Sequence, residues 1–265
     1  MTTRPIALTI AGSDSGGGAG IQADLKTFHA FGAFGTSAIT AITAQNTVGV
    51  RAIQKIDPAV VAEQIRAVAE DLRPAAVKSG MLADAPIIET VAATLQECGL
   101  EHYVLDPVMV AKSGHPLLEA DAVSALASSL LPLAEVITPN LPEAAILAER
   151  RVETVDDMKA AAEALLERGV QSVLIKGGHL PGDMLVDVYF DGQEWREWRD
   201  VRLDTRHTHG TGCTLSAAIC AGLALGWPRV AAVEAARAFT RRAIETAPGL
   251  GAGHGPLNHW AETAR

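Results

Sequence analysis

The stretch that decides the fold is Asp204-Thr205-Arg206-His207-Thr208-His209-Gly210-Thr211-Gly212-Cys213-Thr214, which leads directly into the apolar segment Leu215–Leu225. This arrangement predicts a polar loop that opens a helix. The first N–H groups of such a helix have no partner within it and lie at the positive end of the helix dipole. The predicted helix start is therefore a candidate anion site.

Cys213 falls in the first turn of this predicted helix. The electric field at a helix N-terminus lowers the pKa of a thiol, which makes Cys213 a candidate proton acceptor or nucleophile. A second interpretation is a glycine-rich N-cap followed by a small core cysteine. Short glycine motifs occur widely, so the motif alone leaves both interpretations open.

The composition fits one large α/β domain with a sizeable core: 265 residues, of which 48% are hydrophobic and 20% are charged. We expect residues 1–265 to form a single domain. The net charge of −9 and the scattered Lys and Arg residues argue against a nucleic-acid partner.

The three cysteines, at positions 98, 213 and 220, have no paired spacing. This pattern favours a reducing cytoplasm over a disulfide scaffold or a zinc site. No apolar run reaches the ~18 residues of a membrane-spanning helix, so we expect a cytoplasmic protein without a membrane partner. His207 and His209 lack a third ligand in the sequence, and a metal site at these histidines is not expected.

Strands and helices are predicted to alternate along the chain. Apolar or alternating runs predict strands at Ile6–Ile10, Val50–Ile56, Ala75–Ser79, Tyr103–Leu105, Val136–Thr138 and Ser172–Ile175. Helical spacing predicts helices from Ile21 onward and at Pro58–Arg73, Pro86–Cys98, Glu143–Leu147, Val155–Arg168 and Arg229–Ala247, with a short terminal helix around Leu257–Glu262. The alternation indicates a parallel sheet covered on both faces.

One edge of the sheet is expected to differ, and the sheet also predicts where ligands bind. Met184–Phe190 and Glu194–Val201, joined by Asp191-Gly192, predict a β-hairpin that makes one edge of the sheet antiparallel. Ligands of such sheets bind outside the carboxyl ends of the strands, so we expect one cleft lined by Gly12, Gly80, Asp106 and the residues after Thr138.

The loop Gly12–Gly20 follows the first strand and precedes a helix. It lacks the Lys-Ser/Thr ending of a P-loop and the GxGxxG spacing, so a nucleotide fingerprint is not supported there. The glycines still allow the backbone to approach a ligand closely. Asp24 is either a polar anchor for that ligand or an acidic residue that complements a helix N-terminus.

Other candidate residues stand at strand ends. Gln45 carries a carboxamide that can both donate to and accept from a heterocycle, or it is an ordinary strand-end residue. Asn140 and Glu143 are three residues apart, which suits either a hydrated metal ion or a helix capping box. Lys176 is a candidate phosphate contact.

Five segments together resemble the hydroxymethylpyrimidine/phosphomethylpyrimidine kinases of thiamine biosynthesis, within the ribokinase-like superfamily. They are Ala11–Thr47, Leu105–Gly114, Ile137–Ala144, Lys176–His179 and His209–Ser216. The resemblance covers nearly the whole chain. It implies a ribokinase-like three-layer α/β/α sandwich whose central sheet is mostly parallel with an antiparallel edge hairpin.

The resemblance also implies an activity: phosphorylation of 4-amino-5-hydroxymethyl-2-methylpyrimidine to the monophosphate and then to the diphosphate, with Mg²⁺ and ATP, by a homodimer. The nearest alternative is a pyridoxal or pyridoxine kinase, because that substrate is also a heteroaromatic ring with a hydroxymethyl group. A non-catalytic binder of the vitamin precursor is a further alternative. The presence of Cys213, Asn140, Glu143 and Lys176 together weighs against it.

The resemblance assigns roles to individual residues. Gln45 is similar to the residue that holds the amino edge of the pyrimidine, and Gly12, Asp24, Met81 and Val108 surround the ring. Asn140 and Glu143 resemble the superfamily motif that acts near Mg²⁺ through water, and Lys176 and Thr211 resemble contacts to the nucleotide phosphates. Gly210, Thr211, Gly212 and Cys213 resemble the anion hole, with Cys213 as the base where most superfamily members have an Asp.

Overall fold

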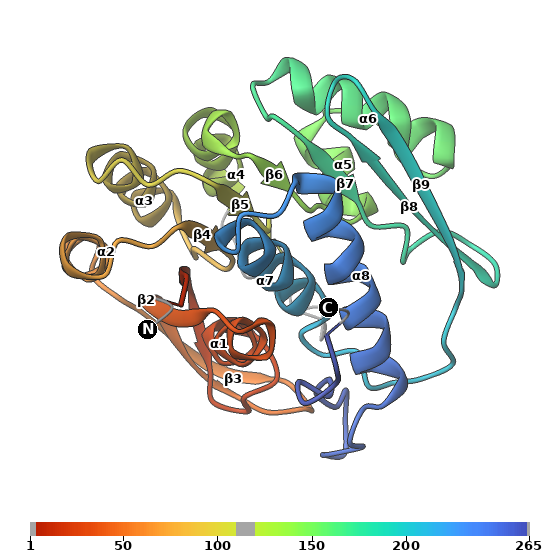
Figure 1. The fold of residues 1–265 in the computed structure, drawn as a ribbon, viewed down its shortest axis with the longest axis horizontal. Coiled ribbons are helices and arrows are strands. Elements are labelled where there is room, and N and C mark those ends of the chain that lie inside the picture. The colour runs from red at the N-terminus through yellow and green to blue at the C-terminus, as the bar shows by residue number, and fades with distance from the viewer. Residues whose placement is uncertain (1–3, 110–119, 264–265) are drawn as a thin grey trace.

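The computed structural model describes residues 4–109 and 120–263. Its strands are β1 (Ile6–Asp14), β2 (Phe34–Gln45), β3 (Val50–Lys55), β4 (Ala76–Ser79), β5 (Tyr103–Leu105), β6 (Val136–Ile137), β7 (Val173–Ile175), β8 (Met184–Phe190) and β9 (Trp195–Val201). They form one sheet in the order β3-β2-β1-β4-β5-β6-β7-β8-β9 (Figure 1).

The α-helices are α1 (Gly20–Phe31), α2 (Pro58–Asp71), α3 (Ala85–Glu97), α4 (Ala120–Ala125), α5 (Leu141–Leu147), α6 (Val155–Glu167), α7 (Thr211–Ala224) and α8 (Arg229–Glu245). A π-helical turn at Leu126–Leu130 and a 3₁₀ turn at Leu131–Leu133 continue α4. The segment 110–114 of the family resemblance lies outside the described residues.

The sheet is parallel in its centre and antiparallel at both edges. All pairs from β2 through β1, β4, β5 and β6 to β7 are parallel. The hairpin of β8 and β9 pairs antiparallel beside β7, as predicted. The opposite edge is antiparallel as well, because β3 returns along β2.

Two hydrophobic cores cover the two faces of the sheet. One core lies under α2 to α6 and includes Ile65, Ile87 and Leu165. The other lies under α1, α7 and α8, which Figure 1 shows side by side, and includes Phe28 and Phe239. The predicted three-layer sandwich with a mostly parallel sheet and an edge hairpin is therefore confirmed.

The helix starts have local causes. Asp57 and Asp84 act as N-caps, accepting bonds from the backbone amides of Ala59 and Ile87, and each is followed by a proline in the first turn.

The predicted terminal helix around Leu257–Glu262 is wrong. The amide of Asn258 donates to the carbonyl of Ala243 in α8 at 2.9 Å, so tertiary contacts take its backbone donor away from a local helix.

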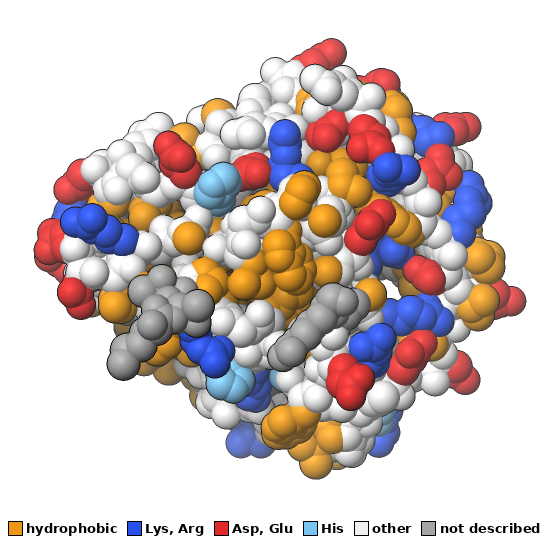
Figure 2. Space-filling model, viewed as in Figure 1, with side chains coloured by type: hydrophobic (Ala, Val, Ile, Leu, Met, Phe, Trp, Pro, Cys, Tyr) orange, Lys and Arg blue, Asp and Glu red, His pale blue; other side chains and the backbone are white. Residues whose placement is uncertain are grey.

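None of the described helices combines the length and the apolar character needed to cross a bilayer. On the face seen in Figure 2, Asp and Glu side chains lie interspersed among Lys and Arg.

The core under α1 is tested by a pair of identical substitutions. Phe28 is fully buried, whereas Phe34, at the start of β2, is 55% exposed. We expect Phe28→Ala to lower the free energy of unfolding by about 3–5 kcal/mol, because it leaves a cavity. Phe34→Ala should change it by less than about 1 kcal/mol. Urea unfolding measures both, and equal losses would contradict the described packing.

Candidate active site

A cleft of about 650 Å³ opens at the carboxyl edge of the sheet. Nearly all the residues that the sequence singled out line it: Gly12, Gln45, Met81, Val108, Asn140, Glu143, Lys176, Gly210, Thr211, Gly212 and Cys213. They come from loops far apart in the chain, which meet because parallel strands place their carboxyl ends together. Asp24 is absent from this lining.

Two glycines allow the loops around the cleft to touch. Gly20 has φ +56° and Gly210 has φ +83°, in the left-handed region that favours glycine. A Cβ at Gly20 would collide with the carbonyl oxygen of Gly12, and a Cβ at Gly210 with that of Gly18. The loop after β1 and the loop before α7 therefore pack backbone against backbone.

The N-terminus of α7 faces the cleft. Gly210 is the N-cap without a side-chain cap, and Thr211, Gly212 and Cys213 form the first turn. The Thr211 hydroxyl donates back to the carbonyl of Thr208 at 2.8 Å and fixes the turn. The amides of this turn and the helix dipole suit the binding of an anion, and the anion site expected there stays a prediction.

Lys176 adds a cation beside this helix start. Its Nζ lies 3.3 Å from Oδ1 of Asp106, and an added Cβ on Gly212 would lie 3.4 Å from the same Nζ. Burial acts to lower the pKa of Lys176, but the carboxylates of Asp106 and Glu143 outweigh it and raise the pKa. Lys176 is therefore positively charged at neutral pH, as a phosphate contact requires.

Asp106, at the end of β5, connects the strands to α7. The hydroxyl of Thr138 donates to one of its carboxylate oxygens and the hydroxyl of Ser216, in α7, donates to the other, each at 3.3 Å. The sequence placed Asp106 at the cleft and assigned it no role. Its contacts show that it is the anion that holds Lys176 in position.

Asn140 and Glu143 form a capping box, so that interpretation is confirmed. Oδ1 of Asn140 accepts from the amide of Glu143 at 2.9 Å, and Oε2 of Glu143 accepts from the amide of Asn140 at 2.8 Å. Both residues also line the cleft. Burial raises the pKa of Glu143 to about 7, with the nearby Asp106 carboxylate acting in the same direction.

The donors here fit Mg²⁺. Carboxylate and amide oxygens are the ligands that this ion prefers, and it keeps several waters when it binds few protein groups. Glu143 and Asp106 line the cleft near Lys176, and Glu143 has a second carboxylate oxygen outside the capping box. Among residues 4–109 and 120–263, however, no cluster of three or more His, Cys, Asp and Glu is arranged to hold a metal directly.

The expectation that the helix field lowers the pKa of Cys213 is wrong for this structure. Burial raises the pKa of the thiol to about 11, and although Lys78 acts in the opposite direction, Asp24 and Asp106 oppose it. The loss of solvation exceeds the effect of the helix dipole, because a thiolate in a low-dielectric site loses its hydration. Cys213 is therefore mainly a neutral thiol at neutral pH.

The prediction that Asp24 contacts the substrate is not supported. Asp24 and Lys78 form an ion pair of 2.8 Å whose two side chains are both fully buried. The hydroxyl of Thr9 donates to the same carboxylate oxygen at 2.6 Å. Asp24 lies beneath the cleft as the counter-ion of Lys78, which does line it.

Lys78 is a residue that the sequence analysis missed. Burial acts to lower its pKa, but the carboxylates of Asp24 and Asp106 together outweigh it and raise the pKa. Its signal in the sequence was a lysine within the apolar strand around Ala75–Ser79. A charge in a buried strand requires a partner, and the partner, Asp24, is 54 residues away.

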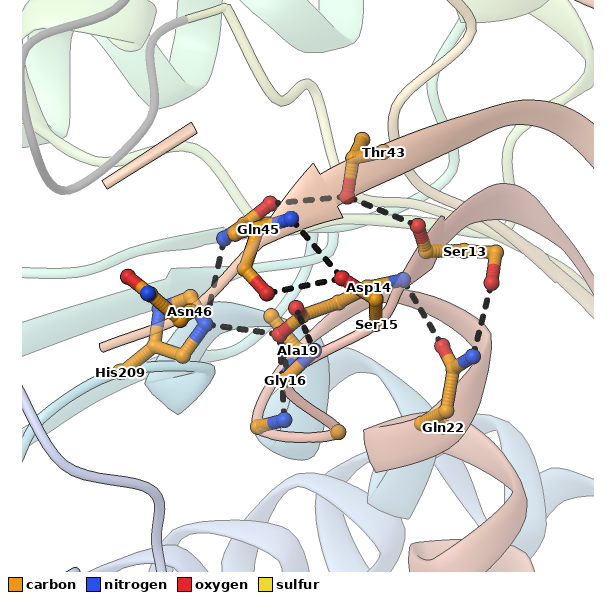
Figure 3. Close-up of polar contacts among 12 residues, drawn as sticks. Ser13, Asp14, Ser15, Gly16, Ala19, Gln22, Thr43, Gln45, Asn46 and His209 are labelled. Carbon is orange, nitrogen blue, oxygen red and sulfur yellow. Dashed lines mark hydrogen bonds and ion pairs between the residues drawn. The ribbon is translucent and has the colours of Figure 1, made fainter. Parts of the chain in front are cut away.

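A second missed group joins the two glycine-containing loops. Nε2 of His209 lies 2.9 Å from Oδ2 of Asp14 and 3.3 Å from Nε2 of Gln45 (Figure 3). Asp14 also accepts from the backbone amides of Gly16 and Ala19. Burial acts to raise the pKa of Asp14, but His209 and these amides outweigh it and lower the pKa. Asp14 is therefore the ionised centre of the loop.

We expect Asp24→Asn to lower the free energy of unfolding by about 3–5 kcal/mol, because it leaves the charge of Lys78 buried without a counter-ion. Lys78→Met should be similarly costly. The double variant should lose at least about 1 kcal/mol less than the sum of the single losses, because neither charge remains alone. Urea unfolding of the four proteins measures this coupling, and strict additivity would contradict it.

Comparisons with known proteins identify the family of this chain. A family model described as phosphomethylpyrimidine kinase matches residues 14–258. Hydroxymethylpyrimidine/phosphomethylpyrimidine kinase of Bacillus subtilis is 51% identical over 256 residues, which cover 96% of this chain and 94% of the relative. The protein of the same name from Rhizobium meliloti is 52% identical over 258 residues, 96% of this chain and 97% of the relative.

A solved structure supports the fold assignment. The ADP complex of Bacillus subtilis pyridoxal kinase superposes with a TM-score of 0.91 at 41% identity, over 98% of each chain. This likeness confirms the ribokinase-like fold. Since the family model matches residues 14–258 and curated relatives are about 50% identical over nearly the whole chain, the chain belongs to the phosphomethylpyrimidine kinase family and is a phosphotransferase.

Proposed function

We propose that this protein transfers the γ-phosphoryl group of ATP to the hydroxymethyl oxygen of 4-amino-5-hydroxymethyl-2-methylpyrimidine and then phosphorylates the monophosphate to the diphosphate. The observation that carries the proposal is one cleft that contains an anion-binding helix start, the cation of Lys176 and the carboxamide of Gln45. We further propose that it acts in the cytoplasm, which the unpaired cysteines favour, and that it is a homodimer, as the family resemblance implies.

The substrate ring lies among Gln45, Gly12, Met81 and Val108 in this proposal. An added Cβ on Gly12 would lie 3.0 Å from Sδ of Met81, so only a glycine leaves the ring space beside the thioether. Gln45 binds the amino edge of the ring, because a carboxamide both donates and accepts. The ring then presents its hydroxymethyl group toward the start of α7.

The phosphates of ATP lie against Lys176 and the first turn of α7. Phosphoryl transfer demands mainly positioning and the stabilisation of negative charge on the transferring group. The amides of Thr211, Gly212 and Cys213 hold that group, and Lys176 neutralises its charge. Asn140 and Glu143 would hold Mg²⁺ through water, and the ion would supply charge neutralisation across the phosphates.

Cys213 serves as the proton acceptor. The hydroxymethyl oxygen forms a bond to the γ-phosphorus while the bond from that phosphorus to the bridging oxygen of ADP breaks, and the hydroxyl proton moves to Sγ of the thiolate form of Cys213, which is the minor form below the thiol pKa of about 11. The second phosphorylation uses a phosphate oxygen that is already ionised. It therefore depends less on Cys213.

The proposal is tested by ATP consumption with the purified protein, Mg²⁺ and three acceptors in parallel: the hydroxymethylpyrimidine, its monophosphate and pyridoxal. Turnover of both pyrimidines, with pyridoxal at least ~100-fold slower in kcat/KM, is the expected result and corresponds to about 2.7 kcal/mol in transition-state binding. Preference for pyridoxal would make this chain a pyridoxal kinase, like the solved relative. Tight pyrimidine binding without ATP consumption would favour a binding protein.

Cys213→Ala should lower the rate of the first phosphorylation by roughly 10²–10⁴-fold and the second by much less. Below the thiol pKa of about 11, the thiolate fraction rises about tenfold per pH unit. The wild-type rate of the first step should therefore increase from pH 7 to pH 9, and Cys213→Ala should lose this increase. Single-turnover assays across this range check both effects, with Cys98→Ala as the matched control outside the cleft.

A variant that spared the first step more than the second would refute the role of Cys213 as base. So would an unchanged pH dependence in Cys213→Ala.

A further inference from the structure

The carboxamide of Gln45 sits in a hydrogen-bonded chain that runs from Asp14 to Ser13. Nε2 of His209 lies between Asp14 and Nε2 of Gln45, and Oε1 of Gln45 lies 3.2 Å from the hydroxyl oxygen of Thr43. That hydroxyl is also 2.9 Å from the carbonyl oxygen of Ser13. Figure 3 shows these groups, from the ends of β1 and β2 and from the loop before α7, pointing toward one another.

The ionised carboxylate of Asp14 determines which atoms of this chain donate hydrogen bonds and which accept them. Its Oδ2 already accepts from the amides of Gly18 at 3.1 Å and Ala19 at 2.9 Å, and an ionised carboxylate has no proton to donate. The bond to His209 therefore requires a proton on Nε2 of the imidazole. A nitrogen that carries a proton cannot accept from the NH₂ of Gln45.

The hydroxyl of Thr43 also requires the amide nitrogen of Gln45 to face Thr43 and the amide oxygen to face His209. It has one proton, which goes to the nearer acceptor, the carbonyl of Ser13. Its oxygen is then free to accept from an NH₂ group. A half-turn of the Gln45 carboxamide exchanges its nitrogen and oxygen at nearly the same positions. The amide nitrogen then donates to the hydroxyl oxygen of Thr43, and the amide oxygen shares the Nε2 proton of His209 with Asp14 as a bifurcated hydrogen bond.

We propose that His209, held by Asp14, is a specificity-determining positioning residue that fixes which end of the Gln45 carboxamide is offered to the substrate ring. The inference rests on the proposed function, in which Gln45 contacts that ring. An aminopyrimidine edge presents a donor beside an acceptor, whereas a pyridoxal edge presents a phenolic oxygen and an aldehyde. A carboxamide that cannot rotate matches one pattern and leaves unpaired groups with the other.

Backbone hydrogen bonds hold the main chain around His209 without any contribution from its imidazole. The amide of His209 donates to the carbonyl of Gly255 at 3.2 Å, and the amide of Thr214 donates to the carbonyl of Gly210 at 2.8 Å. The ring packs so closely on Gly18 that an added Cβ there would lie 2.6 Å from Cδ2 of His209. Phenylalanine keeps this packing and removes the Nε2 donor, so His209→Phe isolates the hydrogen bond.

The experiment compares His209→Phe with His209→Gln, whose amide nitrogen restores a donor at a similar reach. His254→Phe is the matched control, since its Nδ1 contacts the carbonyl of Arg206 away from the cleft. We measure kcat and KM for the hydroxymethylpyrimidine, for pyridoxal and for ATP. His209→Phe should lower kcat/KM for the pyrimidine by about 10–100-fold, mainly through KM, and change that for pyridoxal by less than about threefold.

His209→Gln should recover most of the discrimination, and His254→Phe should match the wild type. Equal losses for both acceptors, or a raised KM for ATP with unchanged discrimination, would overturn the proposal and assign His209 to the shape of the phosphate-binding loop.

A second measurement separates this inference from the proposed function. The side-chain ¹⁵NH₂ signals of Gln45, assigned with Gln45→Glu, report its hydrogen bonding in the protein without substrate. They should shift and exchange faster with solvent in His209→Phe and not in His254→Phe. If the wild type phosphorylates neither ring, the proposed function fails while the NMR result still decides the inference. Unchanged Gln45 signals in His209→Phe would overturn it.

Discussion

The burial of α7 is the constraint on which the rest of the structure depends. Every residue from Thr214 to Ala224 is buried, because α1 and α8 cover this helix on one side and the sheet covers it on the other. A helix enclosed in this way cannot tilt or slide without exposing apolar surface. Its first turn, whose amides are proposed to hold the transferring phosphoryl group, is therefore held at the carboxyl edge of the sheet.

Charges beneath the cleft are arranged around this helix start. The α7 dipole, Lys176 and Lys78 concentrate positive potential there, and each lysine has a buried carboxylate as its counter-ion. The two carboxylates, Asp24 and Asp106, offset the charges of the two lysines, which limits the desolvation cost of two buried cations. The two carboxylates also act against Lys78 on the thiol of Cys213, and burial, the largest effect, raises its pKa.

Several residues at the cleft serve local structure and chemistry together. Asn140 and Glu143 start α5 as a capping box and still line the cleft, so the structural and the functional interpretations of that motif are compatible. Asp14 does the same for its loop: its carboxylate binds three backbone amides and also His209. A side chain fixed by its own backbone contacts requires little reorganisation when a ligand arrives.

The amino-acid sequence determined the features that depend on near neighbours. Apolar periodicity, proline and glycine placed the strands and helices, and the carboxyl-edge rule brought Gln45, Lys176 and Cys213 to one cleft. Tertiary structure decided the direction of β3, the pairing of Asp24 with Lys78 across 54 residues and the contact of His209 with Asp14 across 195. It also decided the pKa of Cys213. Solvation and ion pairing depend on every group that surrounds an atom in space, and a sequence pattern reports the groups within a few residues along the chain.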